Sequence, residues 1–333
     1  MVDVAERAGV SHSTVSRVLT GSAGVHPETR AVVVDAIRDL GYVVNKGARS
    51  LAGGKSSVIG VVVFDFTSRY VSSFLAEMEK TLAQYGYSML LGSAQGSPAN
   101  PLPHIRQIVQ QNICDGLVLL FPGYHRFFVD ERNRQTLPFV LIDEPGSPVA
   151  DCVYIDNRRG TYLAVEHLAK LGHRRIGFIG GHKVTAAGQH RLEGFMAATH
   201  ELGLSADPEL LRDGDWGTYR GFEAATELFA LADPPTAIFA GSDEAAQGVL
   251  AACYEHQLRV PDDISLVGFD DLPIASQSRP PLTTIRQPLD QVTERAFEQL
   301  LRRIEHPKLG YEEIKVQPSI VIRESTAPVS STD

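Results

Sequence analysis

From residue 58 onward, short apolar runs alternate with longer helical patterns, and no other feature of the chain constrains its fold as strongly. The runs include Val58–Phe64, Gly116–Phe121 and Ser265–Phe269, and the last is Ile314–Ile322. Mostly apolar strands separated by helices are typical of parallel sheets covered by helices on both faces. Since roughly 270 residues exceed the usual size of one domain, we predict an α/β fold with two doubly wound lobes. Ligands then bind beyond the carboxyl ends of the strands.

The first 44 residues follow a different pattern, with three short apolar stripes at helical spacing. Gly9 can adopt the positive φ of a tight turn, and Ser11 can cap a following helix through its hydroxyl. Pro27 suits the first turn of a third helix, and Gly41 suits its end. Two helices joined by a short turn and braced by a third predict a small all-helical helix-turn-helix domain in residues 1–44.

Residues 45–57 (NKGARSLAGGKSS) are rich in glycine and serine and separate these two regions. We interpret them as a linker in which residues 48–52 can form a short hinge helix that needs a partner chain or DNA to be ordered. The predicted ranges of the larger region are about 58–156 and 286–313 for a first lobe, about 157–285 and 314–326 for a second lobe, and 327–333 for a polar tail.

Charge and composition narrow the class of protein. The net charge is −9, but the first 57 residues carry +2, so the remainder carries −11. A basic head on an acidic body favours contact of the head with a polyanion. No apolar run approaches the ~20 residues of a membrane span, and the first residues lack the pattern of a secretory signal. Three dispersed cysteines indicate neither a disulfide framework nor a zinc site, so we predict a soluble cytoplasmic protein without metal or cofactor.

Several short motifs occur along the chain in a fixed order. The head carries DVAERAGVS at 3–11, STVSRVL at 13–19, PETR at 27–30 and LGY at 40–42. The larger region continues with EHL at 166–168, LGHRRI at 171–176, GFDD at 268–271 and PLTTI at 281–285. Over nearly its whole length the chain resembles the LacI/GalR (lac-repressor) family of bacterial transcription regulators. The resemblance implies a periplasmic-binding-protein-like effector domain and a homodimer that binds a pseudo-palindromic operator in double-stranded DNA.

The second predicted helix carries the side chains expected to read DNA. His12, Ser13, Ser16 and Arg17 lie on one outward face, and the first residues of such a helix reach base edges in the major groove. Arg17 can donate two hydrogen bonds to guanine. The alternative is a solvated polar face. The resemblance implies base reading by His12, Ser13 and Arg17, and it implies phosphate, positioning or hinge contacts by Ser11, Ser16, Asn45 and Ala48.

Leu51 is an apolar residue in the basic linker. The resemblance implies that it enters the minor groove at the centre of a two-fold operator, where an apolar wedge unstacks a base step and bends the duplex. The alternative is a leucine that packs on a nearby lobe.

A candidate effector site lies where several predicted strands end. Carboxylates and an arginine can hold sugar hydroxyls, while an aromatic face covers the apolar side of a sugar ring. The resemblance implies effector contacts by Asp143, Arg191, Trp216, Ser242, Asp270 and Gln287. Other polar and aromatic residues near strand ends are Asp65, Phe66, Tyr70, Phe74 and Asp243. Strand-end aspartates can instead cap the next helix, and for Asp243 both interpretations remain open.

These features predict a repressor of sugar-utilisation genes that a mono- or disaccharide releases from its operator. A purine- or other metabolite-responsive, co-repressed regulator of the same family is the main alternative. A solute-binding protein would need a secretory signal, and an architectural DNA-binding protein would lack an effector. An enzyme is disfavoured because nucleophile-elbow and zincin motifs are absent. The neighbouring Asp270 and Asp271 point to opposite sides of a strand, which makes a poor acid/base pair.

Overall fold

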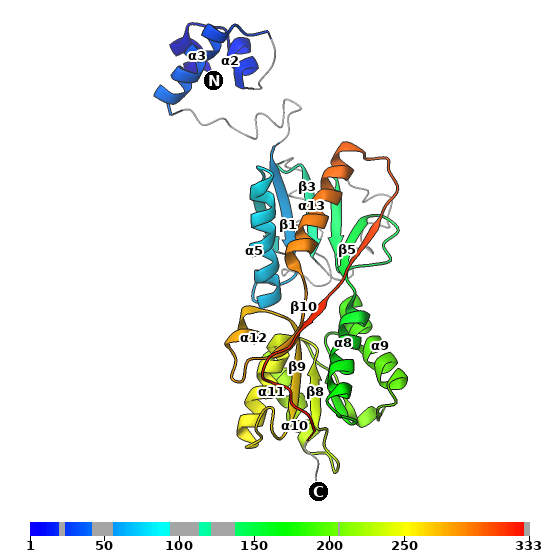
Figure 1. The fold of residues 1–333 in the computed structure, drawn as a ribbon. Helices are drawn as coiled ribbons and strands as arrows, with labels where there is room; N and C mark the ends of the chain where they lie inside the picture. The colour runs from blue at the N-terminus through cyan, green and yellow to red at the C-terminus, as the bar shows by residue number, and fades with distance from the viewer. Residues whose placement is uncertain (20–23, 42–55, 94–112, 121–136, 206, 330–333) are drawn as a thin grey trace. The chain divides into compact units, whose positions relative to one another are not determined.

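The computed structural model describes residues 1–19, 24–41, 56–93, 113–120, 137–205 and 207–329 (Figure 1). The chain divides into two compact units, Met1–Ser56 and Ser57–Asp333. The predictions for Asn45, Ala48 and Leu51 lie outside the described residues.

Within its described residues, the smaller unit contains three helices, α1 (Val2–Ala8), α2 (His12–Leu19) and α3 (Pro27–Asp39). They share a core that includes Val4, Val15 and Val33, each with no exposed surface. Gly9 has a φ of 64°, and the Ser11 hydroxyl accepts a hydrogen bond from the Thr14 backbone N–H at 3.2 Å. The predicted helix-turn-helix arrangement, with its glycine turn and serine cap, is therefore confirmed.

The larger unit contains two six-stranded sheets. In the first, all strands are parallel and the order is β11-β5-β4-β3-β1-β2. In the second, the order is β12-β10-β9-β8-β6-β7, and only β12 is antiparallel to its neighbour. The strands of the first sheet are β1 (Val58–Val63), β2 (Ser88–Ser93), β3 (Gly116–Leu120), β4 (Phe139–Ile142), β5 (Asp151–Ile155) and β11 (Glu313–Val316). Those of the second are β6 (Ile176–Ile179), β7 (Leu211–Arg212), β8 (Ala237–Ala240), β9 (Ser265–Asp270), β10 (Thr283–Arg286) and β12 (Ser319–Val321).

Helices flank each sheet and complete two lobes (Figure 1). In the first lobe, α5 (Arg69–Gln84) and α13 (Leu289–Glu305) pack on each other and on the sheet, and a 2.9 Å hydrogen bond joins Thr81 and Thr293. In the second lobe, the rings of Phe178 and Phe195 stack with centroids 4.8 Å apart. The helices of the second lobe are α8 (Asn157–Lys170), α9 (Ala186–Glu201), α10 (Thr218–Phe229), α11 (Asp243–Glu255) and α12 (Pro273–Gln277), with a short 3-10 helix at Pro208–Leu210. Two lobes of doubly wound parallel sheet confirm the predicted fold class.

The prediction of one strand over Ile314–Ile322 is wrong. Residues 313–316 pair with β5 in the first sheet, and residues 319–321 pair with β10 in the second. Pro318 separates them, since proline has no N–H with which to continue a ladder. The first lobe therefore extends to Val316 rather than to residue 313.

The predicted polar tail also begins later than residue 327. The Ala327 N–H donates to the Ser265 hydroxyl at 3.0 Å, and the Val329 N–H donates to the Leu171 carbonyl at 3.0 Å. Both bonds fasten residues 327–329 to the second lobe.

Candidate functional site

Helix α2 presents the predicted DNA-reading residues on one face. Ser11, His12, Ser13 and Arg17 are exposed and Ser16 is half-buried, whereas the opposite face of the helix is buried in the domain core. The hydroxyls of Ser11 and Ser13 lie 2.8 Å apart, so part of this face is already ordered by hydrogen bonds. The structure thus brings together all the predicted contacts that fall in the described part of the head.

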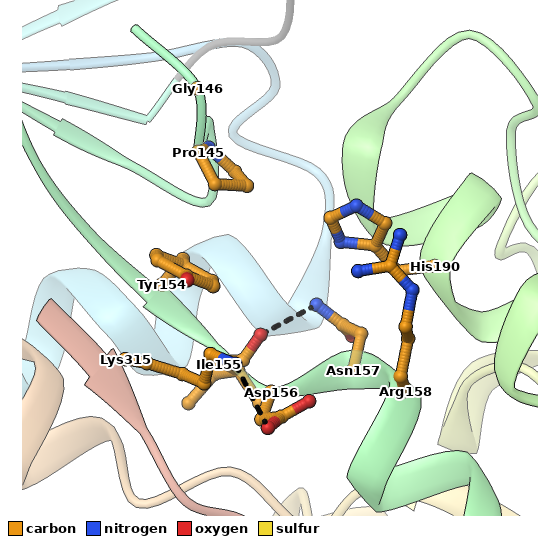
Figure 2. Close-up of a pocket in the computed structure, with 9 residues that line it drawn as sticks. All are labelled: Pro145, Gly146, Tyr154, Ile155, Asp156, Asn157, Arg158, His190 and Lys315. Atoms are coloured by element: carbon orange, nitrogen blue, oxygen red, sulfur yellow. Dashed lines mark hydrogen bonds and ion pairs between the residues drawn. The ribbon is translucent and has the colours of Figure 1, made fainter. Parts of the chain in front are cut away.

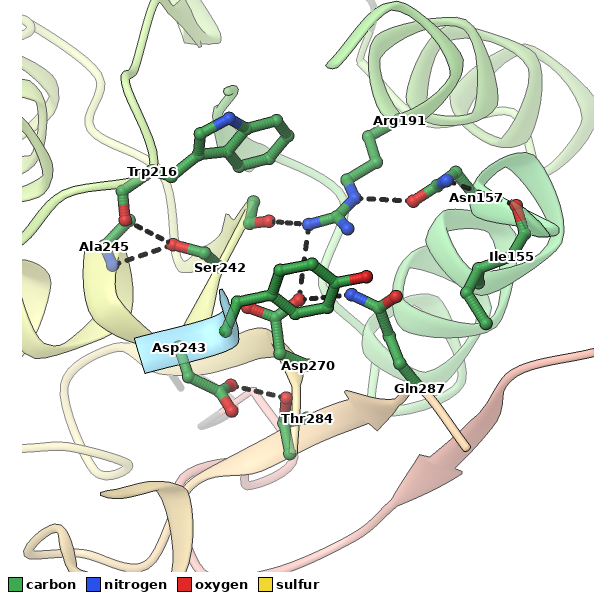
Figure 3. A network of polar contacts seen from close by, with 12 residues as sticks. Ile155, Asn157, Arg191, Trp216, Ser242, Asp243, Ala245, Asp270, Thr284 and Gln287 are labelled. Carbon is green, nitrogen blue, oxygen red and sulfur yellow. Dashed lines mark hydrogen bonds and ion pairs between the residues drawn. The ribbon is translucent and has the colours of Figure 1, made fainter. Parts of the chain in front are cut away.

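Arg191 is the centre of a polar cluster in the larger unit, at the carboxyl ends of strands of the second sheet (Figure 3). It lies on α9 and is 5% exposed. Its Nε donates to Asn157 Oδ1 at 2.8 Å and its Nη1 donates to the Gly241 carbonyl. The guanidinium carbon lies 4.7 Å from a ring centroid of Trp216 and 3.6 Å from that of Phe269. Burial lowers the pKa of Arg191, while its acidic neighbours act in the opposite direction.

The Trp216 ring occupies space that a small residue leaves open. A β-carbon at position 181 would lie 2.0 Å from the ring, so the ring can take this place only because residue 181 is a glycine. Trp216 itself has a φ of 72°, and its carbonyl accepts a hydrogen bond from the Ser242 hydroxyl at 2.7 Å. The indole is therefore held in a fixed position beside Arg191.

Asp270 and Gln287 provide acceptors next to Arg191. Asp270 ends β9 and is 6% exposed, and its Oδ1 accepts from Gln287 Nε2 at 2.6 Å and lies 3.7 Å from Arg191 Nη1. Burial raises the pKa of Asp270 to about 7, although Arg191 acts against that rise. Among the described residues, Gln287 Oε1 is buried without a hydrogen-bond partner. A buried acceptor left unpaired is costly, so this group favours a ligand that donates a hydrogen bond.

The first lobe contributes a hydroxyl and a carboxylate. The Tyr70 hydroxyl donates to Asp143 Oδ2 at 2.8 Å, and the Ile155 N–H lies 3.3 Å from Asp143 Oδ1. Asp143 follows β4 and has a φ of 56°. Burial raises the pKa of both side chains, and for Tyr70 the Asp143 charge adds to the rise. The Asp143 carboxylate is close enough to Arg191 for that cation to oppose the rise in its pKa.

Three of the predicted effector residues have structural roles instead. Phe74 has no exposed surface and belongs to the core of the first lobe. Asp243 is also fully buried, and its two oxygens accept from the Thr284 hydroxyl at 2.6 Å and the Leu272 N–H at 2.7 Å. Ser242 caps α11 by accepting from the Ala245 N–H at 3.0 Å, and its hydroxyl donates to the Trp216 carbonyl.

Asp65 and Phe66 lie in the turn that precedes α5. Asp65 accepts hydrogen bonds from the backbone N–H and the hydroxyl of Thr67, each at 2.8 Å. Phe66 is 41% exposed. The predicted residues that the structure gathers around Arg191 are thus Tyr70, Asp143, Trp216, Asp270 and Gln287.

Sequence reasoning missed Asn157, which holds Arg191 in place. Its Oδ1 accepts from Arg191, and its Nδ2 donates to the Ile155 carbonyl at 3.2 Å. The signal was available, because Asn157 closely follows the apolar run 152–155, just as Asp143 and Asp270 closely follow strands.

A cavity of about 260 Å³ opens between the lobes, and Asn157 is one of the residues that line it (Figure 2). Its basic side chains already have partners: Arg158 donates to Glu193, and Lys315 lies 3.5 Å from Asp156. The cavity is lined by Pro145, Gly146, Tyr154, Ile155, Asp156, Asn157, Arg158, His190 and Lys315.

The described part of the chain shows neither a metal site nor a membrane span. It contains no cluster of three or more histidine, cysteine or acidic side chains that could hold a metal ion. Over the same residues, no helix is long and apolar enough to cross a bilayer.

A helix-turn-helix unit joined to two lobes with a polar cluster defines the class of ligand-responsive DNA-binding regulators. The first residues match the model of bacterial regulatory proteins of the lacI family over 1–45, and residues 165–326 match a periplasmic binding protein-like domain. The chain is 33% identical over 330 residues to the transcriptional repressor PurR of Mannheimia succiniciproducens, covering 98% of each. It is 35% identical over 329 residues to PurR of Klebsiella pneumoniae, covering 98% of this chain and 96% of that one. The chain therefore belongs to the LacI family, whose members are transcription regulators rather than enzymes.

Solved structures agree with this assignment. The Lac repressor dimer bound to operator and the anti-inducer ONPF has a TM-score of 0.88, with 29% identity and 98% of each chain covered. The complex of the regulator CelR with cellobiose has a TM-score of 0.73, with 28% identity and 97% and 98% covered. A LacI-family regulator from Enterococcus faecium with bound ribose has a TM-score of 0.72, with 26% identity, and matches 82% of this chain and all of that one.

Proposed function

We propose that this chain forms a homodimeric repressor whose α2 helices read a pseudo-palindromic operator and which a small neutral sugar releases from DNA. Two copies related by a two-fold axis present two recognition helices to two half-sites. The similar Lac repressor binds operator as a dimer, which supports this assembly.

The acceptor-rich chemistry around Arg191 carries the sugar proposal. Asp143 and Asp270 place two carboxylates beside one guanidinium, and Gln287 Oε1 has no donor among the described residues. An anionic ligand would add a third negative charge to this buried site, which is unfavourable at low dielectric. A neutral ligand with several hydroxyls supplies donors to the acceptors, and the Trp216 ring can cover its apolar face.

A purine ligand is the second candidate, and the similarity to PurR repressors favours it. A purine base is planar and also carries N–H donors, so Trp216 and Asp270 could hold it. The two candidates also have opposite effects on operator affinity, because a purine would recruit the protein to DNA as a co-repressor, whereas a sugar would release it. The bound cellobiose and ribose of two structural neighbours support the sugar.

The effector can release the protein from DNA if it binds one arrangement of the two lobes more tightly than a second arrangement. The cluster takes Tyr70 and Asp143 from the first lobe and Arg191, Asp270 and Gln287 from the second, so a ligand held by both sets biases the lobes. In the dimer this bias reaches the two linkers, and effector and operator then change each other's affinity by the same factor.

The proposal is tested by selecting binding sites from randomised pseudo-palindromic DNA and repeating the binding with mono- and disaccharides. We expect a two-fold site whose affinity falls with one sugar. If a purine base raises the affinity of the protein for the selected site, the effector is a purine co-repressor and not a sugar. A protein that selects no site with or without ligand would contradict the DNA assignment.

Leu51 enters the same proposal as the wedge in the minor groove, and Ala48 enters it as a DNA contact of the hinge. Replacing Leu51 by alanine removes the wedge, so operator affinity should fall while sugar binding is unchanged. Unchanged operator affinity would contradict the wedge. Arg17→Met is the companion variant, since it should relax the preference for guanine at one position of each half-site.

A further inference from the structure

The turn after β9 has an unusual backbone. Asp270 has a φ of 118° and the next residue, Asp271, has a φ of 57°. Side-chain-bearing residues rarely adopt these conformations, and two in succession persist only where surrounding contacts hold them. The turn directs Asp270 into the cluster around Arg191, so whatever holds the turn also aims the acceptor.

Asp271 has the contacts needed to hold it. Its side chain is 7% exposed, and its two oxygens accept from Arg286 Nε at 2.6 Å and Arg323 Nη2 at 2.5 Å. Arg323 is itself fixed, because its Nη1 donates to the Leu282 carbonyl at 2.7 Å and its N–H donates to the Thr283 hydroxyl at 2.9 Å. Charge-assisted bonds of this kind are short and directional.

The two neighbouring aspartates face different partners. Across the β9–β10 ladder, Asp270 is the register partner of Arg286. The next residue on the β10 side, Gln287, donates its side-chain amide to Asp270, while Arg286 turns to Asp271. Gln287 thus binds Asp270 inside the cluster around Arg191, whereas the neighbouring Arg286 binds Asp271 outside it.

The partners of Asp271 come from the ends of two neighbouring strands of the second sheet, β10 and β12. Arg286 ends β10, and the chain then enters α13 of the first lobe at Leu289. Arg323 follows the other end of this strand pair, two residues after β12. Asp271 therefore ties the ends of β10 and β12 to the same turn that carries Asp270.

We infer that Asp271 is a positioning residue for the effector site. Bound by Arg286 and Arg323, it holds the turn so that Asp270 faces Arg191 and Gln287, and it ties this turn to the ends of β10 and β12. The role in effector response rests on the proposed function, whereas the positioning of Asp270 can be tested without any ligand.

The test uses Trp216, the single tryptophan of the chain, as a reporter in the full-length protein. Asp271→Asn keeps the shape of the side chain but removes its charge, so the turn should relax and Asp270 should leave Arg191. Arg191 stays bound to Asn157 and Gly241 but loses the carboxylate beside it, so the charge acting on the Trp216 ring 4.7 Å away changes, and we expect a shift of Trp216 emission and of its quenching by acrylamide.

Asp151→Asn is the matched control. Asp151 is 1% exposed and accepts from Arg303 Nε at 2.8 Å and Nη2 at 3.1 Å, but it lies in the first lobe at the start of β5. Both variants should lower the melting temperature, but only Asp271→Asn should change Trp216 fluorescence. Wild-type emission and quenching in folded Asp271→Asn would overturn the inference, as would an equal change in both variants.

A second variant covers the case in which Asp271→Asn does not fold. Arg323→Gln removes one of the two partners and should shift Trp216 in the same direction by a smaller amount. An unshifted, folded Arg323→Gln protein would overturn the joint role of the two arginines. If neither sugars nor purine bases bind wild-type protein, the proposed effector fails, but the fluorescence comparison still decides the role of Asp271.

Discussion

The two lobes have the same strand order around a parallel core, but their sheets end in different chemistry. The second lobe places a buried arginine, a buried aspartate and a buried glutamine within one bonded cluster, through Arg191, Asp270 and Gln287. The first lobe contributes Tyr70 and Asp143, joined to each other by one hydrogen bond. One architecture therefore carries two different sets of polar residues at its strand ends.

Under the proposed function, the second lobe supplies most of the ligand contacts, and the first lobe supplies the pair of Tyr70 and Asp143. Arg191 is fixed by Asn157 and Gly241 within its own lobe, so its geometry does not depend on the other lobe. Tyr70 lies in the first turn of α5, and its hydroxyl bond to Asp143 links that helix to the end of β4.

Arg191→Met should have the largest effect. Removing one partner from a buried charged cluster leaves acids without a cation, so we expect a loss of about 3–5 kcal/mol in the free energy of unfolding. Urea unfolding measures this, and sugar-induced operator release should disappear. The control is Arg158→Met, since Arg158 is exposed and pairs with Glu193. Equal stability of the two variants would contradict a central role for Arg191.

Tyr70→Phe tests the smaller contribution of the first lobe. It removes the donor to Asp143, and an unpaired buried acceptor costs about 1–3 kcal/mol, so effector affinity should fall by roughly tenfold. Titration calorimetry with the active sugar measures the change. Tyr162→Phe is the control, because its hydroxyl donates to Glu201 on an exposed surface. Wild-type affinity in Tyr70→Phe would confine recognition to the second lobe alone.

The raised pKa of Asp270 gives the second lobe a pH-dependent stability. Because its folded pKa of about 7 exceeds the ordinary value of 3.8, protonation of Asp270 favours the folded state. That contribution is complete below about pH 4 and is lost as the pH rises through 7. The melting temperature of wild type minus that of Asp270→Asn should therefore fall between pH 5 and 8, as followed by calorimetry. A difference that rises over this range would contradict the burial of Asp270.

The smallest effect is expected at the ion pair that joins the lobes directly. Arg69 Nε of α5 lies 3.5 Å from Glu244 Oε1 of α11, and the arginine side chain is 63% exposed. Surface pairs contribute about 0.2–1 kcal/mol, so Arg69→Glu should change operator affinity by less than about fivefold. The double variant Arg69→Glu with Glu244→Arg should restore it. A change that the double variant does not restore would assign the effect to Arg69 alone.

The sequence was sufficient to predict the three helices of the head and both lobes, and it pointed to polar residues at strand ends that the structure gathers around Arg191. It could not separate Asp270 from Asp243, because the partners of Asp243 are Thr284 and Leu272, which only the folded chain brings near it. The error at Phe74 was avoidable. Phe74, Met78 and Leu82 repeat at helical spacing, and all three are buried in the core of the first lobe.

The end of the chain shows a second limit. Ile314, Val316, Ile320 and Ile322 follow the alternation of one strand across residues 314–322, but the chain changes sheet at Pro318. Asn157 was missed for a related reason. Asn157 contributes to the site by its hydrogen bond to Arg191, a residue 34 positions away in the chain.

The most direct measurement is a titration of Trp216 fluorescence with sugars and purine bases, in wild type and in Asp270→Asn. The cluster predicts that one sugar changes the emission saturably in wild type, that Asp270→Asn binds it much more weakly, and that purine bases have no effect. A response to a purine base but to no sugar would contradict the sugar proposal. An equal response to the sugar in both proteins would contradict the role of the second lobe's acceptors.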